Sequence, residues 1–250
     1  MNPPDESARP GRWARAAADW TRGLSFDALV VIVAATILII LFHENGSSSV
    51  FRGKFLKYFS PSEFLDLYPA FYWYGCSLLL LGIVPFLLGR LVLGFPTRDL
   101  GLGLGDWKFG LKATFGLYFA FLPILVLVSY LPSFQSKYPL FYEATSSGTH
   151  FFVYECAYAV YFIGWEFIFR GFMLFGLRPS IGFYAVFVQM IPFAILHFGK
   201  AQIETLAAVF AGVLLGYLAL RARSFWYGWL LHTLVAVSND VLVMLHKHWL

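Results

Sequence analysis

The segment WEFIFRGF, at residues 165–172, carries a glutamate and an arginine inside an otherwise apolar run. Glu166 and Arg170 are four residues apart, so on a helix they share a face and can form an ion pair. Burial raises the pKa of a carboxylate toward neutrality, and a neighbouring cation lowers that pKa again, so such a group can be tuned as a general base. The alternative is a buried ion pair with a purely structural role, in which the two charges only compensate each other.

Two histidines in later apolar runs add to this pair. His197 lies in IPFAILHFGK and His232 lies in WYGWLLHTLVAVSND. At 1.5 Å per helical residue, they and Glu166 lie roughly 12–24 Å from the inner ends of their helices. A single buried histidine is usually an ordinary core residue, but ionisable groups inside membrane spans are costly and usually functional. The pattern therefore predicts one polar site in which histidines hold a water and stabilise an oxyanion.

The elements that carry these residues are predicted to be membrane helices. The chain of 250 residues is 59% hydrophobic and only 13% charged, with a mean hydropathy of +0.69, which is outside the range of soluble domains. A bilayer span needs about 20 apolar residues. We therefore predict an all-α, polytopic bundle of about seven transmembrane helices, over residues 25–43, 68–95, 111–131, 150–176, 181–198, 203–221 and 225–246.

Charge and cysteine content limit the remaining possibilities. The net charge of +4 is small and dispersed, so we expect lipid and no nucleic acid as a partner. Arginines in the tail at residues 1–24 and in the inner connections predict a cytoplasmic N terminus and a C terminus outside. Residues 25–250 are expected to form a single transmembrane domain. Cys76 and Cys156, both in apolar runs, provide no disulfide framework.

The motifs together resemble the CAAX-protease and bacteriocin-processing (CPBP) family of intramembrane endopeptidases. The family signature is Glu-Glu-x-x-x-Arg, then Phe-x-x-x-His, then His-x-x-x-Asn or Asp, on successive helices. The matching residues are Glu166 and Arg170 in the first element, Phe193 and His197 in the second, and His232 in the third. The resemblance covers roughly residues 98–245.

This resemblance implies hydrolysis of a peptide bond in a membrane-associated protein or peptide, lipidated ones included, without a cofactor. Glu166 corresponds to the second glutamate of the signature, which supports the site and pairs with the arginine. In the implied reaction Glu166 or a relocated carboxylate is the base, His197 positions the water, and His232 stabilises the oxyanion. The sequence departs from the family twice. Trp165 stands where the family has the first, water-activating glutamate, and Ala236 stands four residues after His232, where a polar residue is expected.

Two arrangements could supply the polar groups that are missing at Trp165 and Ala236. A modest rotation of the helix could let Glu166 act as the base, because it lies only 100° around the helix from position 165. Alternatively, another polar residue takes the place of the missing ones. Glu204 lies seven residues after His197, and Asn239 and Asp240 follow His232 by seven and eight residues. Glu204 can equally be a solvated residue at the head of its span.

Two other functions and a metal-dependent form of the hydrolase remain possible from the sequence. A catalytically inactive relative would bind a membrane partner through the same cavity, since loss of a general base removes a factor of a hundred or more in rate. A small transporter would need polar residues that continue toward both membrane faces. A zinc site formed by His197, His232 and Glu166 is a further alternative, because two histidines and a carboxylate are a common catalytic ligand set.

Overall fold

The computed structural model describes residues 25–247, and these form a bundle of helices without a β-strand. The predicted all-α membrane fold is thereby confirmed, and the tail predicted at residues 1–24 lies outside the described residues. Within residues 25–247, six helical stretches are long and apolar enough to cross a membrane. The protein is a multi-pass integral membrane protein.

The helices that build the bundle follow one another with short connections. The long ones are α2 (Phe26–Asn45), α6 (Trp107–Ser129), α11 (Gln202–Ala222) and α12 (Trp226–His246). Two further spans are composite: α4 (Tyr68–Cys76), η4 (Ser77–Ile83), α5 (Val84–Leu87) and η5 (Leu88–Val92) form one, and α8 (Gly148–Glu166), η8 (Phe167–Met173) and α9 (Leu174–Ile181) form the other. The shorter elements are α3 (Ser48–Lys54), α7 (Pro132–Gln135) and α10 (Tyr184–Ile195).

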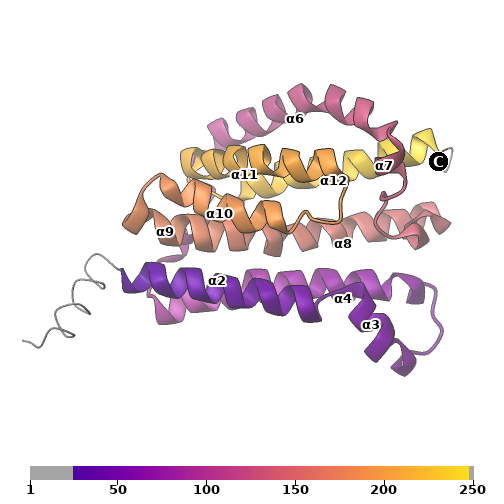
Figure 1. Ribbon diagram of the computed structural model, residues 1–250, viewed down its shortest axis with the longest axis horizontal. Helices are drawn as coiled ribbons and strands as arrows, with labels where there is room; N and C mark the ends of the chain where they lie inside the picture. Colours follow the sequence, from indigo (N-terminus) through magenta and orange to yellow (C-terminus); the bar gives the residue numbers. More distant parts are fainter. Residues whose placement is uncertain (1–24, 248–250) are drawn as a thin grey trace, which may run out of the picture.

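The predicted span at residues 181–198 contains a helix that is shorter than the other spans. Its helix, α10, has 12 residues, about 18 Å, and stops at Ile195. Pro192 lacks the N–H that would continue the hydrogen-bond ladder, and Gly199 has a φ of +89° in the turn that follows. A short helix and an irregular segment therefore lead to α11. The start of α2 and the end of α12 nevertheless lie at opposite ends of the bundle (Figure 1).

The helices are stacked in layers around α8. Figure 1 shows α2 and α4 on one side, α8, α9 and α10 in the middle, and α11, α12 and α6 beyond them. Of the most apolar window in the α8–α9 stretch, 83% is buried, against 11% for α6. The helix that carries the charged pair is therefore the core of the bundle and the one most shielded from lipid.

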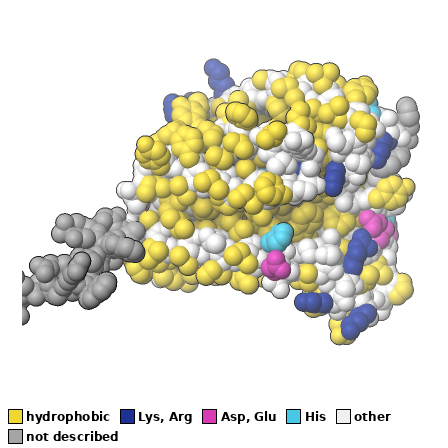
Figure 2. All heavy atoms as spheres, in the orientation of Figure 1, with side chains coloured by type: hydrophobic (Ala, Val, Ile, Leu, Met, Phe, Trp, Pro, Cys, Tyr) yellow, Lys and Arg dark blue, Asp and Glu magenta, His cyan; other side chains and the backbone are white. Residues whose placement is uncertain are grey.

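The outer surface is suited to a bilayer. Figure 2 shows hydrophobic side chains over most of the visible face, with Lys and Arg gathered mainly toward its right-hand end. Phe119 on α6 and Phe210 on α11 are 62% and 77% exposed. Exposed aromatic side chains on this scale have no favourable place in water, so this surface contacts lipid acyl chains.

Close backbone contact fixes α8 against η4. A Cβ added at Gly164 would lie 2.2 Å from the carbonyl oxygen of Ser77, and one at Gly82 would lie 3.3 Å from the Cα of Gly164. The Ser77 hydroxyl donates to the carbonyl of Tyr161 at 3.0 Å. Small residues permit such an approach in membranes, where packing rather than the hydrophobic effect holds helices together.

Replacing Gly164 by alanine is expected to destabilise the protein by about 1–3 kcal/mol, since the methyl group meets backbone atoms that cannot move independently. The measurement is unfolding by SDS in mixed micelles, followed by tryptophan fluorescence. Gly75→Ala on α4 is the matched control, because no atom lies within 4 Å of its added Cβ. Equal midpoints for the two variants would contradict the close contact.

A second small-residue contact places α10 on α11. The side-chain amide of Gln189 donates to the carbonyls of Val186 and Gly212, both at 2.8 Å. A Cβ at Gly216 would lie 2.8 Å from the same amide nitrogen. This contact holds α10, and with it the turn that carries His197, against the rest of the bundle.

Candidate active site

The carboxylate of Glu166 is the centre of the polar site. Glu166 is the last residue of α8 and is fully buried. Its Oε1 accepts a hydrogen bond from Nη1 of Arg170 at 3.0 Å and another from Nδ1 of His232 at 2.7 Å. The structure thus joins the charged pair predicted on one helix to a histidine 66 residues later in the chain.

Local features of three helices bring these groups together. Directly after Glu166 the chain is wound as a π-helix, η8, a form that is rare and frequent at functional sites. On α12, Gly228 leaves room for the carboxylate, because a Cβ there would lie 3.0 Å from Glu166 Oε2. The guanidinium carbon of Arg170 lies 4.0 Å from the centre of the Phe193 ring, which supports it from α10 by a cation–π contact.

His197 reaches the same site from the turn after α10. Its Nδ1 lies 2.7 Å from the carbonyl oxygen of Phe193, and its own carbonyl accepts from the Thr205 hydroxyl at 2.9 Å. Its ring lies nearly parallel to that of His232, at 15°, with centroids 6.3 Å apart. The two imidazoles therefore lie side by side, within the reach of one small molecule between or beside them.

The hydrogen-bond partners fix where the protons lie. Carboxylate and carbonyl oxygens only accept, so the Nδ1 atoms of both histidines carry hydrogen. In a neutral imidazole the other nitrogen, Nε2, then has a free lone pair. His232 keeps a 16% exposed side chain, whereas that of Glu166 is fully buried. The accessible basic atoms of the site are therefore the two Nε2 nitrogens.

Trp165 forms a wall of this site. It is 6% exposed, stacks on Tyr161 with ring centroids 5.4 Å apart, and meets the His197 ring edge-on at 5.8 Å. Its indole Nε1 has no hydrogen-bond partner among the described residues. Where the family resemblance expects a carboxylate next to His197, the site has an aromatic surface.

Glu204 has a different partner from the one a relocated base requires. Its Oε1 accepts the Tyr138 hydroxyl at 2.5 Å and lies 3.8 Å from the Lys200 ammonium. Burial, together with the Glu204 charge, raises the pKa of Tyr138 well above its usual range, so this tyrosine remains a donor. Glu204 therefore belongs to a network with Tyr138 and Lys200 at loops and helix ends, and its hydrogen bond and ion pair are with these two residues.

Asn239 and Asp240 lie farther along α12. Both are buried, and Asp240 interacts with the charges of Glu155 and Lys200 rather than with His232. Glu155 was missed in the sequence, although a charge inside the predicted span at residues 150–176 was a usable signal. No sequence signal singles out Tyr138, whose role depends on tertiary contacts.

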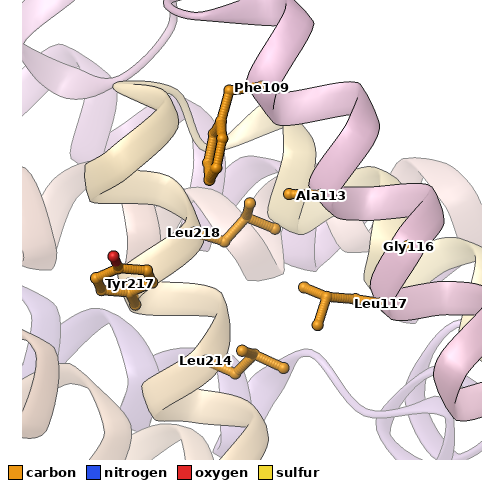
Figure 3. A pocket seen from close by; sticks show the side chains of 7 residues that line it. All are labelled: Phe109, Ala113, Gly116, Leu117, Leu214, Tyr217 and Leu218. Atoms are coloured by element: carbon orange, nitrogen blue, oxygen red, sulfur yellow. The ribbon is translucent and has the colours of Figure 1, made fainter.

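The donor set does not favour a metal. Among residues 25–247, no group of three or more His, Cys, Asp or Glu side chains is placed to hold an ion. A groove of about 350 Å³ between α6 and α11 lies elsewhere and carries no candidate residue (Figure 3). Leu117 and Leu218 project into it, and Ala113 and Gly116 leave it open, so it is an apolar recess in a surface that faces lipid.

Comparison with known proteins agrees with the geometry. Residues 148–238 match the family model described as type II CAAX prenyl endopeptidase Rce1-like. The match extends from the start of α8 into α12 and so includes Glu166, His197 and His232. No curated protein and no solved structure matches the chain. Over residues 148–238 the chain is therefore similar to the type II CAAX prenyl endopeptidases.

Proposed function

We propose that the protein is an intramembrane endopeptidase that hydrolyses a peptide bond of a membrane-associated protein or peptide. The observation that supports this most is the 2.7 Å contact between Glu166 and His232 beside a second, parallel imidazole. A carboxylate that holds Nδ1 of a histidine makes Nε2 a general base, as in catalytic dyads and triads. The peptidase family supplies the substrate class.

In this proposal His232 is the base and Glu166 orients it, whereas the sequence analysis expected Glu166 or a relocated carboxylate as the base and His232 as the oxyanion stabiliser. Glu166 Oε1 already accepts two hydrogen bonds, and Oε2 is buried against Gly228. Arg170 lies 3.0 Å from Oε1 and compensates the charge of the carboxylate. A water molecule beside Glu166 Oε2 would have less room than a water molecule at the partly exposed edge of the His232 ring.

The reaction then needs only one water and the groups present. The water oxygen attacks the peptide carbonyl carbon while His232 Nε2 takes one of its protons, and the Glu166 carboxylate stabilises the imidazolium. His197 Nε2 accepts the second water hydrogen and thereby orients the attacking lone pair. When the C–N bond breaks, the imidazolium returns its proton to the leaving amine.

Cleavage by the full-length protein in liposomes tests this function. The substrates are membrane-anchored peptides with and without a prenyl group, and products are identified by mass spectrometry. We expect cleavage by the wild-type protein, no effect of EDTA, and loss of cleavage in the double variant His197→Ala/His232→Ala. His43→Ala, at an exposed position of α2, is the control. Equal cleavage by the double variant would mean that another enzyme or another site is responsible.

A second candidate is a non-catalytic relative that binds a membrane segment. Trp165 favours it, because the indole fills the place of the family's water-activating glutamate and makes the wall beside His197 apolar. In that case peptides would bind the wild-type protein and Glu166→Gln with similar affinity, and no product would form with any peptide. Product formation by the wild-type protein alone would exclude this candidate.

A further inference from the structure

The groove between α6 and α11 has the shape of a site for a single alkyl chain. Phe109, Ala113 and Gly116 line it from α6, and Leu214 and Leu218 line it from α11. Phe109 lies toward one end of the groove and Leu214 toward the other (Figure 3). The groove follows α6 for about two turns, or about 11 Å. A volume of about 350 Å³ over that length corresponds to a cross-section of about 30 Å², much smaller than that of a helix about 10–12 Å in diameter.

Two cations, one from each helix, lie on the groove side near its Phe109 end. The guanidinium carbon of Arg221 lies 4.4 Å from the centre of the Phe109 ring, and Arg221 follows the lining residue Leu218 by three positions. Lys112 follows Phe109 by three positions and precedes Gly116 by four, so the helix places it on the same side of α6 as these two residues. The side chains of both cations are exposed. The apolar groove therefore has a basic end.

The positive charge at this end is only partly compensated. Residues 98–112 and 221–223 contain five cations and two carboxylates, a net charge of +3. Among the described residues Arg221 makes one hydrogen bond, to Asp106 at 3.3 Å, and Lys112 makes no ion pair with a carboxylate. A guanidinium has five N–H donors, so Arg221 retains donors for an anion.

The basic end lies at the level of lipid headgroups. Arg221 is in the last turn of α11, and Lys112 is in the second turn of α6. The backbone N–H of Asp106 donates to the carbonyl of Ala222 at 2.8 Å, which holds these two helix ends together. Trp107, 54% exposed, is at the same end, and tryptophan side chains favour the membrane–water interface. The groove therefore begins near the headgroups and extends toward the bilayer core.

We propose that this groove binds one anionic phospholipid. Its acyl chain lies along α6 and α11, and its phosphate lies at Arg221 and Lys112. Arginine binds phosphate oxygens through paired N–H donors, and lysine attracts them as a point charge. Basic pockets between membrane helices bind anionic headgroups in this way. A zwitterionic lipid carries a cation of its own, which the excess positive charge at this end repels.

The bound lipid adds contacts to the most exposed span of the bundle. Only 11% of the most apolar window of α6 is buried. Its side-chain hydrogen bonds to α12 join the Thr114 hydroxyl to the carbonyl of Tyr227 at 3.3 Å, and the hydroxyls of Tyr118 and Ser238 at 2.7 Å. An acyl chain in the groove contacts both α6 and α11. Because this site exists only in the folded protein, lipid binding stabilises the fold.

Lipid binding to the purified full-length protein in detergent tests the proposal. Dioleoylphosphatidylglycerol and dioleoylphosphatidylcholine, which differ only in the headgroup, are titrated. Native mass spectrometry counts the bound lipid, and thermal unfolding gives a midpoint. We expect about one phosphatidylglycerol per chain, bound at least about tenfold more tightly than phosphatidylcholine, and a midpoint raised by several degrees. Glycerol phosphate, which has the headgroup anion without acyl chains, should leave the midpoint unchanged.

A variant that fills the groove tests the position of the acyl chain. Gly116→Leu places a side chain in the groove, and the fold should tolerate it because no atom lies within 4 Å of an added Cβ. We expect this variant to lose the tight binding of phosphatidylglycerol. Gly75→Leu is the matched control, since this exposed glycine of α4 is equally open.

A variant without the two cations tests the position of the phosphate. Lys112→Gln/Arg221→Gln should bind phosphatidylglycerol about tenfold more weakly and phosphatidylcholine unchanged. Lys54→Gln/Lys57→Gln, the same change of charge at other exposed positions, should bind as the wild type does. This pair of variants changes only exposed side chains, so it decides the question even if Gly116→Leu does not fold.

Four results would overturn the proposal. The two lipids could bind with equal affinity, or glycerol phosphate could raise the midpoint as much as phosphatidylglycerol does, in which case the cations hold an ion alone. A folded Gly116→Leu, or Lys112→Gln/Arg221→Gln, could bind phosphatidylglycerol as tightly as the wild type. His232→Ala should retain full lipid binding, because the groove and the peptidase centre share no residue.

Discussion

The variant His232→Ala is expected to lower the rate of peptide cleavage by about 10²–10⁴-fold, the range for removal of a general base. Its imidazole is the accessible end of the dyad, with Nδ1 held by Glu166 and Nε2 free. The fold should persist, because the side chain is 16% exposed and the Glu166–Arg170 pair stays intact. Single-turnover rates with a cleaved peptide in liposomes give the size of the loss.

The partner variant distinguishes the two candidate bases. If His232 is the base, Glu166→Gln retains an oxygen that can accept from Nδ1 and shows a partial loss. The double variant Glu166→Gln/His232→Ala should then be no slower than His232→Ala alone, because the rate losses of residues that act as a unit do not add. If Glu166 takes the proton itself, Glu166→Gln is the slowest single variant and His232→Ala keeps more activity. A His232→Ala rate within tenfold of wild type would contradict the dyad.

The sequence was sufficient for the bundle and for most of the site's composition. Mean hydropathy and the lengths of the apolar runs predict membrane helices, because the bilayer sets the length of a span. The spacing of Glu166 and Arg170 predicts their pairing, since a helix places residues four apart on one face. Both inferences rest on local geometry, which the sequence encodes directly.

What the sequence could not provide depends on contacts between helices. The proposed role of His232 as base follows from two contacts of Glu166 with α12: His232 bonds to Oε1, and Gly228 lies beside Oε2. The hydropathy of residues 181–198 does not indicate that α10 ends at Ile195 and is followed by an irregular turn. Glu155 interacts with Asp240 only because the antiparallel packing of α8 and α12 brings the two residues together.

Arg170 is expected to be the residue on which the stability of the site depends most. Its guanidinium is fully buried, donates to Glu166 at 3.0 Å and lies 4.0 Å from the centre of the Phe193 ring. Removing one partner of a buried ion pair leaves an uncompensated charge and costs about 3–5 kcal/mol. We expect Arg170→Met to lower the free energy of unfolding by this amount in SDS titrations. Arg98→Met, at an exposed side chain, should have little effect.

Removing the second charge should recover much of that loss. In Arg170→Met/Glu166→Gln no carboxylate is left at this pair, and an amide can still accept from Nδ1 of His232. The double variant is therefore expected to be more stable than Arg170→Met, although it differs from the wild type at one more position. The coupling free energy between the two substitutions measures how much an unpaired Glu166 carboxylate destabilises the core. If the two changes were simply additive, Glu166 would not be held as an anion by Arg170, and the charge that supports the His232 imidazolium in the proposed reaction would be missing.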